Sequence, residues 1–67
     1  MTTVFVNKFD TQDIALDFIF DEGEKLGVVY DDVATTVKGD TRIDYVDTEE
    51  GNVRLLVRQN GTVDRVL

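Results

Sequence analysis

The stretch that decides the fold is EEGNVRLLVRQNGTVDRV, residues 49–66, in which two glycine turns flank runs of apolar and β-branched residues. Asn-Gly between such runs is the strongest short-range signal of a β-hairpin. Lys38-Gly39-Asp40 gives a third turn further upstream. We therefore expect an antiparallel meander with strands near 32–37, 42–48, 53–59 and 62–66, joined by two-residue loops at Gly39-Asp40, Glu50-Gly51 and Asn60-Gly61.

The N-terminal part predicts one more strand and one helix. Residues 2–7 alternate around Val4 and Val6, as a short strand does. Asp10 occupies the position of a helix N-cap and Gly27 that of a C-cap, so a helix is expected over residues 11–26.

The expected fold class is α+β, in the order β-α-β-β-β-β, as a single domain over residues 1–67 with the helix packed on one sheet face. Gly23 weakens the last turn of the helix, because glycine costs a helix about 1 kcal/mol relative to alanine.

Two-residue loops fix a register, and the register assigns side chains to faces. The face expected to lie against the helix collects Val33, Val37, Val46, Val53, Leu55, Val57 and Val66. The opposite face collects Ile43, Tyr45, Leu56, Val63, Leu67, Arg54, Arg58 and Arg65, with Asp47 directly across from Arg54. A slip of one residue at a turn would exchange these sets beyond that point.

The composition argues against most catalytic chemistry. The 67 residues contain no His, Cys, Trp, Pro or Ser, so nucleophile triads, zinc sites and disulfides cannot be assembled. Phosphate-loop and calcium-loop patterns are also missing. We expect a non-enzymatic protein without metal or cofactor. No apolar run exceeds three residues, which predicts a protein free of the membrane. The absence of cysteine fits a location in the cytoplasm, the host cytoplasm if the protein is viral.

Charge is unevenly distributed along the chain. Fourteen acids against seven bases give a net charge of −7. Residues 1–50 hold 13 acids and 4 bases, whereas residues 51–67 hold 1 acid and 3 bases. This polarity predicts a surface that meets a partner.

The helix carries the first candidate surface. Its members fall within an arc of about 80° at 100° per residue, and we call them the acidic stripe: Asp13, Asp17, Asp21 and Glu24. Carboxylates four residues apart rise about 6 Å along a helix, a spacing comparable with that of successive phosphates along a nucleic-acid strand. The stripe is either a solvated helix face or a mimic of nucleic acid that enters a basic groove.

A second candidate surface lies on the sheet. Aromatic, arginine and aliphatic side chains are typical of binding hot spots, and the predicted face brings together Tyr45, Arg54, Leu56, Arg58 and Arg65. The net charge of −7 argues against direct nucleic-acid binding through it. A protein contact and an amphipathic solvent face remain equal alternatives.

The leading hypothesis is a small protein-binding module, an acidic inhibitor of a basic nucleic-acid-binding protein, of the kind used in viral takeover of a host. One alternative is a structural protein that forms a homodimer or larger assembly, either through the second surface or through the wide apolar arc of the helix around Leu16 and Phe20. Another is a salt-adapted domain whose acids have no binding role.

Overall fold

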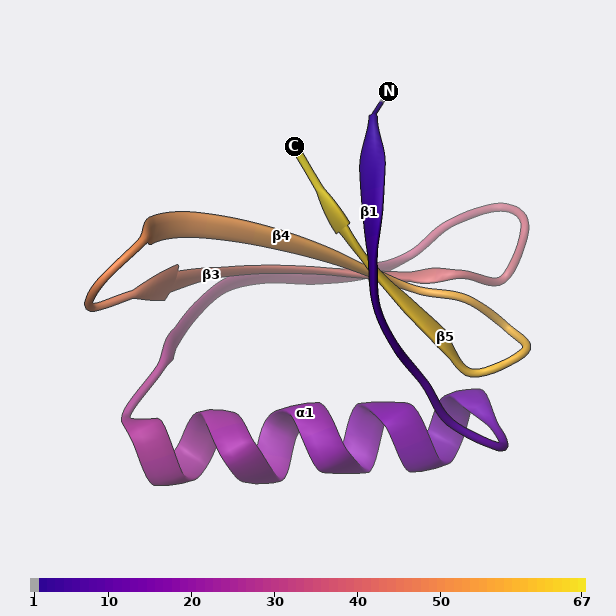
Figure 1. Ribbon diagram of the computed structural model, residues 1–67, viewed down its shortest axis with the longest axis horizontal. Coiled ribbons are helices and arrows are strands. Elements are labelled where there is room, and N and C mark those ends of the chain that lie inside the picture. The colour runs from indigo at the N-terminus through magenta and orange to yellow at the C-terminus, as the bar shows by residue number, and fades with distance from the viewer. Residues whose placement is uncertain (1) are drawn as a thin grey trace.

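The computed structural model describes residues 2–67 as one helix packed against one face of a five-stranded antiparallel sheet (Figure 1). The elements are β1 (Thr3–Lys8), α1 (Gln12–Leu26), β2 (Val29–Thr35), β3 (Thr41–Asp47), β4 (Gly51–Val57) and β5 (Thr62–Val66). The order of strands across the sheet is β1-β5-β4-β3-β2. The predicted class and element order are confirmed, and the N-terminal strand joins the four-stranded meander beside β5.

The helix is capped one residue later than expected. Thr11, not Asp10, is the N-cap, and its hydroxyl oxygen accepts a hydrogen bond from the Ile14 amide at 3.2 Å. Gly27 ends the helix in the left-handed conformation, with φ at 70°, as predicted. At the N-terminal end, the Gln12 side-chain amide donates to carbonyl oxygens of Gly39 and Val57, which ties α1 to the sheet.

The helix continues through Gly23 to Leu26, and this glycine makes room for a neighbour. It is buried, and a Cβ atom there would lie 1.9 Å from the Tyr30 hydroxyl. Tyr30 in turn packs edge-on against Phe20, with ring centroids 5.3 Å apart. The glycine therefore allows an aromatic ring from β2 to lie against the helix backbone.

All three hairpin loops contain three residues, not the two that we expected. Asp47 pairs with Gly51, the Thr36 amide donates to the Asp40 carbonyl, and the Arg58 amide donates to the Thr62 carbonyl. Gly39 and Gly61 have φ of 86° and 89°, and each donates its amide to the carbonyl three residues earlier. A tight turn followed by a left-handed residue is the usual geometry of three-residue loops.

The longer loops change the register and correct the predicted faces. Each register differs from the expected one by an odd number of residues, so the faces exchange at every hairpin. The helix side therefore carries Ile43, Tyr45 and Val63, which we had placed on the other face, together with Val33, Val53, Leu55 and Val57. Val46 and Val66 move to the open face, while Val37 lies in a loop and is fully exposed.

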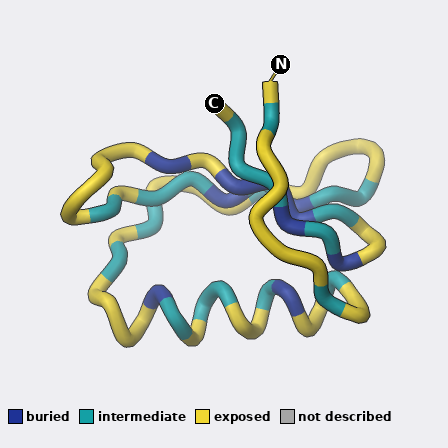
Figure 2. The backbone as a smooth tube through the Cα atoms, in the orientation of Figure 1, coloured by how far each residue is buried: buried dark blue, intermediate teal, exposed yellow. Residues whose placement is uncertain are grey.

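The core lies between α1 and the middle of the sheet. Ala15 on the helix is fully buried against a cluster made of Ile43, Val53, Leu55, Val57 and Val63. Burial falls away on the outward face of α1 and along β1 (Figure 2). The two ends of the described chain meet, since Thr3 pairs with Val66 and the Leu67 amide donates to the Thr2 carbonyl at 2.9 Å. Within residues 2–67, α1 is too short and too polar to cross a membrane.

Candidate functional site

The acidic stripe lies on the face of α1 that points away from the sheet. Asp13, Asp17, Asp21 and Glu24 are all exposed, while Ala15 and Gly23 face the sheet and are buried. The outward side of the helix is exposed along its length in Figure 2. The helical period thus brings together, on one accessible surface, the four residues that the sequence selected.

Little positive charge offsets the stripe. The helix holds five acids and one base, a net charge of −4 out of −7 for the chain. Lys25 lies 3.3 Å from Asp21 and 3.5 Å from Glu22, and the hydrogen bond to Asp21 is the main reason that its pKa is raised. Among the described residues, Asp13, Asp17 and Glu24 form no ion pair. The stripe is therefore a field of carboxylates with a single counter-ion at its C-terminal end.

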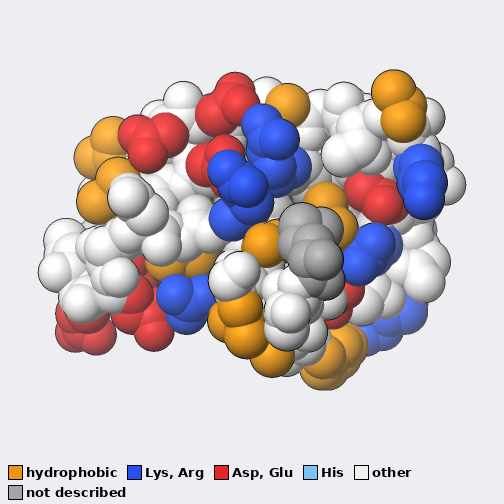
Figure 3. Space-filling model, turned by 90° about the horizontal axis from the view of Figure 1, so that it is seen from above, with side chains coloured by type: hydrophobic (Ala, Val, Ile, Leu, Met, Phe, Trp, Pro, Cys, Tyr) orange, Lys and Arg blue, Asp and Glu red, His pale blue; other side chains and the backbone are white. Residues whose placement is uncertain are grey.

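The open face of the sheet has the opposite character. Arg54 donates to Asp44 at 2.7 Å, and this hydrogen bond is the main cause of the raised pKa of Arg54. Arg42 donates to Asp32 at 2.8 Å and Arg58 to Asp64 at 3.2 Å. Blue and red side chains consequently alternate over this face in Figure 3. Each of these arginines is neutralised by an aspartate from a neighbouring strand.

The structure does not bring the second candidate surface together. Arg54, Leu56 and Arg58 lie on the open face, but Tyr45 lies on the helix side, where its ring centroid is 6.1 Å from that of Tyr30. Arg65 pairs with Leu55 and so belongs to the helix side, at 2.8 Å from Glu50.

Two details of that surface also differ from expectation. The residue opposite Arg54 is Asp44, not Asp47, as the three-residue loop requires. Sequence reasoning missed Asp32, Asp44 and Asp64 as arginine partners, and only the correct loop length would have found them.

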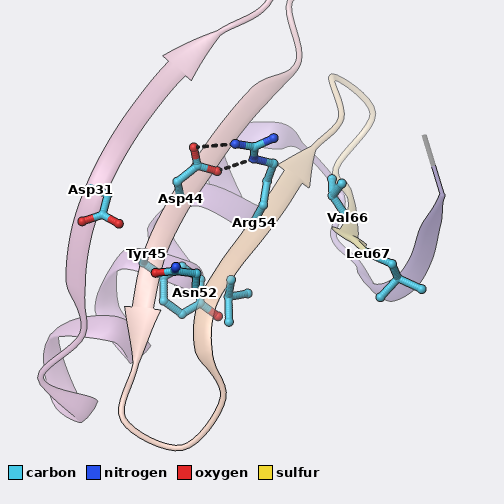
Figure 4. Close-up of a pocket in the computed structure, with 8 residues that line it drawn as sticks. Asp31, Asp44, Tyr45, Asn52, Arg54, Val66 and Leu67 are labelled. Carbon is cyan, nitrogen blue, oxygen red and sulfur yellow. Dashed lines mark hydrogen bonds and ion pairs between the residues drawn. The ribbon is translucent and has the colours of Figure 1, made fainter.

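A shallow groove of about 400 Å³ runs over the open face beside the Asp44–Arg54 pair (Figure 4). Asp31, Asn52, Val66 and Leu67 also line it. Both oxygens of Asp44 face the Arg54 guanidinium, so this carboxylate is already engaged. Across residues 2–67, no three acidic side chains come together in a group that could hold a metal ion. The groove is lined by polar side chains and by charges of both signs.

The fold and the site together define a small α+β domain that presents an acidic helix on one side and a charge-paired sheet on the other. Comparison with protein-family models, with curated proteins and with solved structures finds no match to this chain. What the protein does is therefore inferred from the geometry described above.

Proposed function

We propose that this protein is a non-enzymatic binding module that presents the acidic stripe of α1 to a basic surface of a partner protein. The most specific form of the proposal is an inhibitor that occupies the nucleic-acid-binding groove of its partner. The observation that carries it is that the stripe is exposed and largely without counter-ions, whereas the arginines of the open sheet face pair with aspartates.

The spacing of the stripe supports mimicry of a phosphate backbone. From Asp13 to Glu24 the helix rises about 16 Å, at 1.5 Å per residue. Four carboxylates over that length offer a partner several negative charges in a fixed row. A basic groove gains binding free energy from nucleic acid because counter-ions are released, and it would gain free energy in the same way on binding this row of carboxylates.

The rigidity of the stripe supports the same proposal. The Thr11 cap, the Gly27 cap and the Gln12 hydrogen bonds hold α1 at both ends. Because the helix backbone is already ordered, a partner that binds the stripe has to order only the carboxylate side chains. Charge steering would also accelerate the encounter with a basic partner.

The test is the capture of partners from a lysate of the cells in which the protein is naturally made. Wild-type protein on a support should retain proteins that are released by an excess of duplex DNA or RNA. The double variant Asp17→Lys/Asp21→Lys should reduce this retention at least tenfold, since it reverses two charges of the acidic stripe and changes the net charge by +4.

A matched control separates the stripe from net charge alone. Asp31→Lys/Glu49→Lys changes the net charge equally at two exposed positions that form no ion pair within residues 2–67, and it should bind as wild type does. Equal loss in both double variants would contradict a specific role for the stripe. Partner proteins that remain bound in an excess of DNA or RNA would contradict mimicry of nucleic acid. A wild-type chain that is unfolded in dilute buffer and folds only in molar salt would assign the acids to salt adaptation.

A further inference from the structure

The two edges of the sheet are protected to different degrees. β1 and β2 are the edge strands, so within the described residues 2–67 each leaves a row of backbone amide and carbonyl groups without a strand partner. Both strands also contain a bulge, after Phe5 in β1 and after Tyr30 in β2. The bulges therefore do not distinguish the edges, but the residues at them do.

β2 carries charge where a neighbouring strand would pair. Asp31 and Asp32 are consecutive and exposed at its bulge, and Asp32 is held by Arg42. Charged residues on an edge strand oppose pairing with another strand, because they would be desolvated there. Val29 and Val33 are exposed on either side, but the two aspartates lie between them.

β1 has no such protection. Val4, Phe5 and Val6 are consecutive and have exposed fractions of 44%, 67% and 51%. Because successive strand residues point to opposite faces, apolar surface is exposed on both sides of this strand. Residues 2–9 contain no acid, in a chain that has fourteen.

Lys8 is the one charged residue of β1, and its side chain extends toward the β4–β5 loop and not from the free edge of the strand. The Lys8 ammonium donates to the Phe9 carbonyl at 2.8 Å and to the Asn60 carbonyl in the β4–β5 loop at 2.6 Å. Lysine commonly protects edge strands by projecting into the space that a partner would occupy. Here the side chain is used to tie β1 to the next hairpin.

We infer that the free edge of β1 pairs antiparallel with β1 of a second copy of this chain, to form a continuous ten-stranded sheet. Two copies that each carry −7 repel, and the acid-free edge is where they approach at least electrostatic cost. An antiparallel strand pair is symmetric, so the same edge satisfies both partners about one two-fold axis. The acidic β2 edge stops further addition, so the assembly closes as a dimer and does not extend into a fibre.

This arrangement differs from both homodimer surfaces that the sequence suggested, and it does not depend on the function proposed for α1. The two-fold axis of an antiparallel strand pair is perpendicular to the sheet, so both helices lie on the same face of the dimer. The outward faces of the helices, with their acidic stripes, remain free. The paired edge is short, so the interface is smaller than the standard size of about 800 Å² per partner, and we expect weak association that is seen only at high protein concentration.

The experiment is sedimentation equilibrium of the wild-type chain from about 5 µM to 1 mM, in salt high enough to screen repulsion between copies. The average mass should rise from 7.6 kDa toward twice that value. Val6→Lys, which places a charge on the β1 edge, should raise the dissociation constant at least tenfold. Val33→Lys is the matched control, because it places the same charge at a similarly exposed valine of β2 and should leave the dimer intact.

A direct readout complements the masses. In a sample that mixes isotope-labelled and unlabelled chains, nuclear Overhauser contacts between chains should connect β1 to β1. Phe5→Lys serves as a second edge variant if Val6→Lys does not fold by circular dichroism. A wild type that stays monomeric at 1 mM would overturn the inference. So would a dimer that both β1 variants leave unchanged, or one whose contacts between chains lie outside β1.

Discussion

The outward face of α1 and the open face of the sheet hold similar numbers of acids, but the acids of the two faces differ in how many of them pair with a base. On α1, five acids share one lysine. On the open face, Asp32, Asp44 and Asp64 each meet an arginine from an adjacent strand, and Asp40 lies 3.6 Å from Arg58. The net charge of the chain is thus concentrated on the helix, and the sheet uses its charges internally.

The difference teaches that equal residue types serve unequal purposes in the two layers. Cross-strand pairs between opposite charges stabilise a sheet by a few tenths to about 1 kcal/mol each. Aspartates four apart on a helix destabilise it by about 0.2–0.5 kcal/mol per pair. The acids of the sheet therefore support the fold, whereas the repulsion between Asp13, Asp17 and Asp21 opposes the helix slightly.

The largest effect is expected where the two layers meet. Ile43 of β3 is fully buried beneath α1, so Ile43→Ala should lower the free energy of unfolding by about 3–4 kcal/mol, through lost burial and a cavity that cannot collapse. Urea unfolding followed by circular dichroism measures the change.

The comparison for this variant is Leu56→Ala on the open face. Leu56 is also buried, but it lines a groove of the open face together with Arg42, Arg54 and Arg58, whose long side chains can move toward the vacated space. Its loss should be about half as large. Equal losses would mean that the arginine layer is packed as firmly as the helix.

A smaller effect is expected from neutralising one acid in each layer. Asp44 accepts two hydrogen bonds from Arg54 and its side chain is only 19% exposed, so Asp44→Asn should cost about 1–2 kcal/mol. Asp17→Asn should change stability by no more than about 0.5 kcal/mol, toward stabilisation, because it removes repulsion from Asp13 and Asp21. Thermal melts in low and high salt would test this pair. A destabilising Asp17→Asn would contradict the view that the stripe contributes nothing to the fold.

A further effect concerns the contact between β2 and α1, and it depends on pH. Burial raises the pKa of the Tyr30 hydroxyl, and burial followed by the charge of Asp47 raises that of Tyr45. Both folded pKa values therefore lie above the unfolded value of about 10. The stability from these neutral phenols is complete below pH 10 and is lost as pH rises above it.

The Tyr30→Phe variant isolates the contribution of Tyr30. The Tyr30 hydroxyl is buried and finds no hydrogen-bond partner within residues 2–67, so its removal should raise the free energy of unfolding at pH 7 by about 1 kcal/mol. The variant should also lose less stability between pH 9 and 11 than wild type does, as chemical denaturation at each pH would measure. An identical alkaline loss would place the responsible ionisation elsewhere.

Much of the fold could be predicted because local signals determine it. Glycine turns between β-branched runs gave the hairpins, and Gly27 gave the end of the helix. The loop lengths could not be predicted, since Asn-Gly suits a two-residue loop and also a three-residue loop with its glycine in the left-handed conformation. Asp10 and Thr11 are both good caps, and the sequence does not rank them.

The candidate surfaces differ in the same way, because one depends on a local signal and the other on the strand register. The acidic stripe depends only on the helical period, so its four members were predicted together, and the structure places them on one exposed face. The grouping of Tyr45 with Arg54 depended on register, and one odd change in loop length separated them. Gly23 was misjudged because its role depends on Tyr30, a contact that no local pattern contains.

The pairing of Thr3 with Val66 has a consequence for how the chain folds. The hairpins from β2 to β5 join neighbours in sequence, and each closes a loop of three residues at small entropic cost. β1 can join β5 only after nearly the whole chain has been brought end to end, and pairings of such high contact order are slow to form. We therefore expect β1 to pair last during folding, and its amide protons to exchange before those of the other strands.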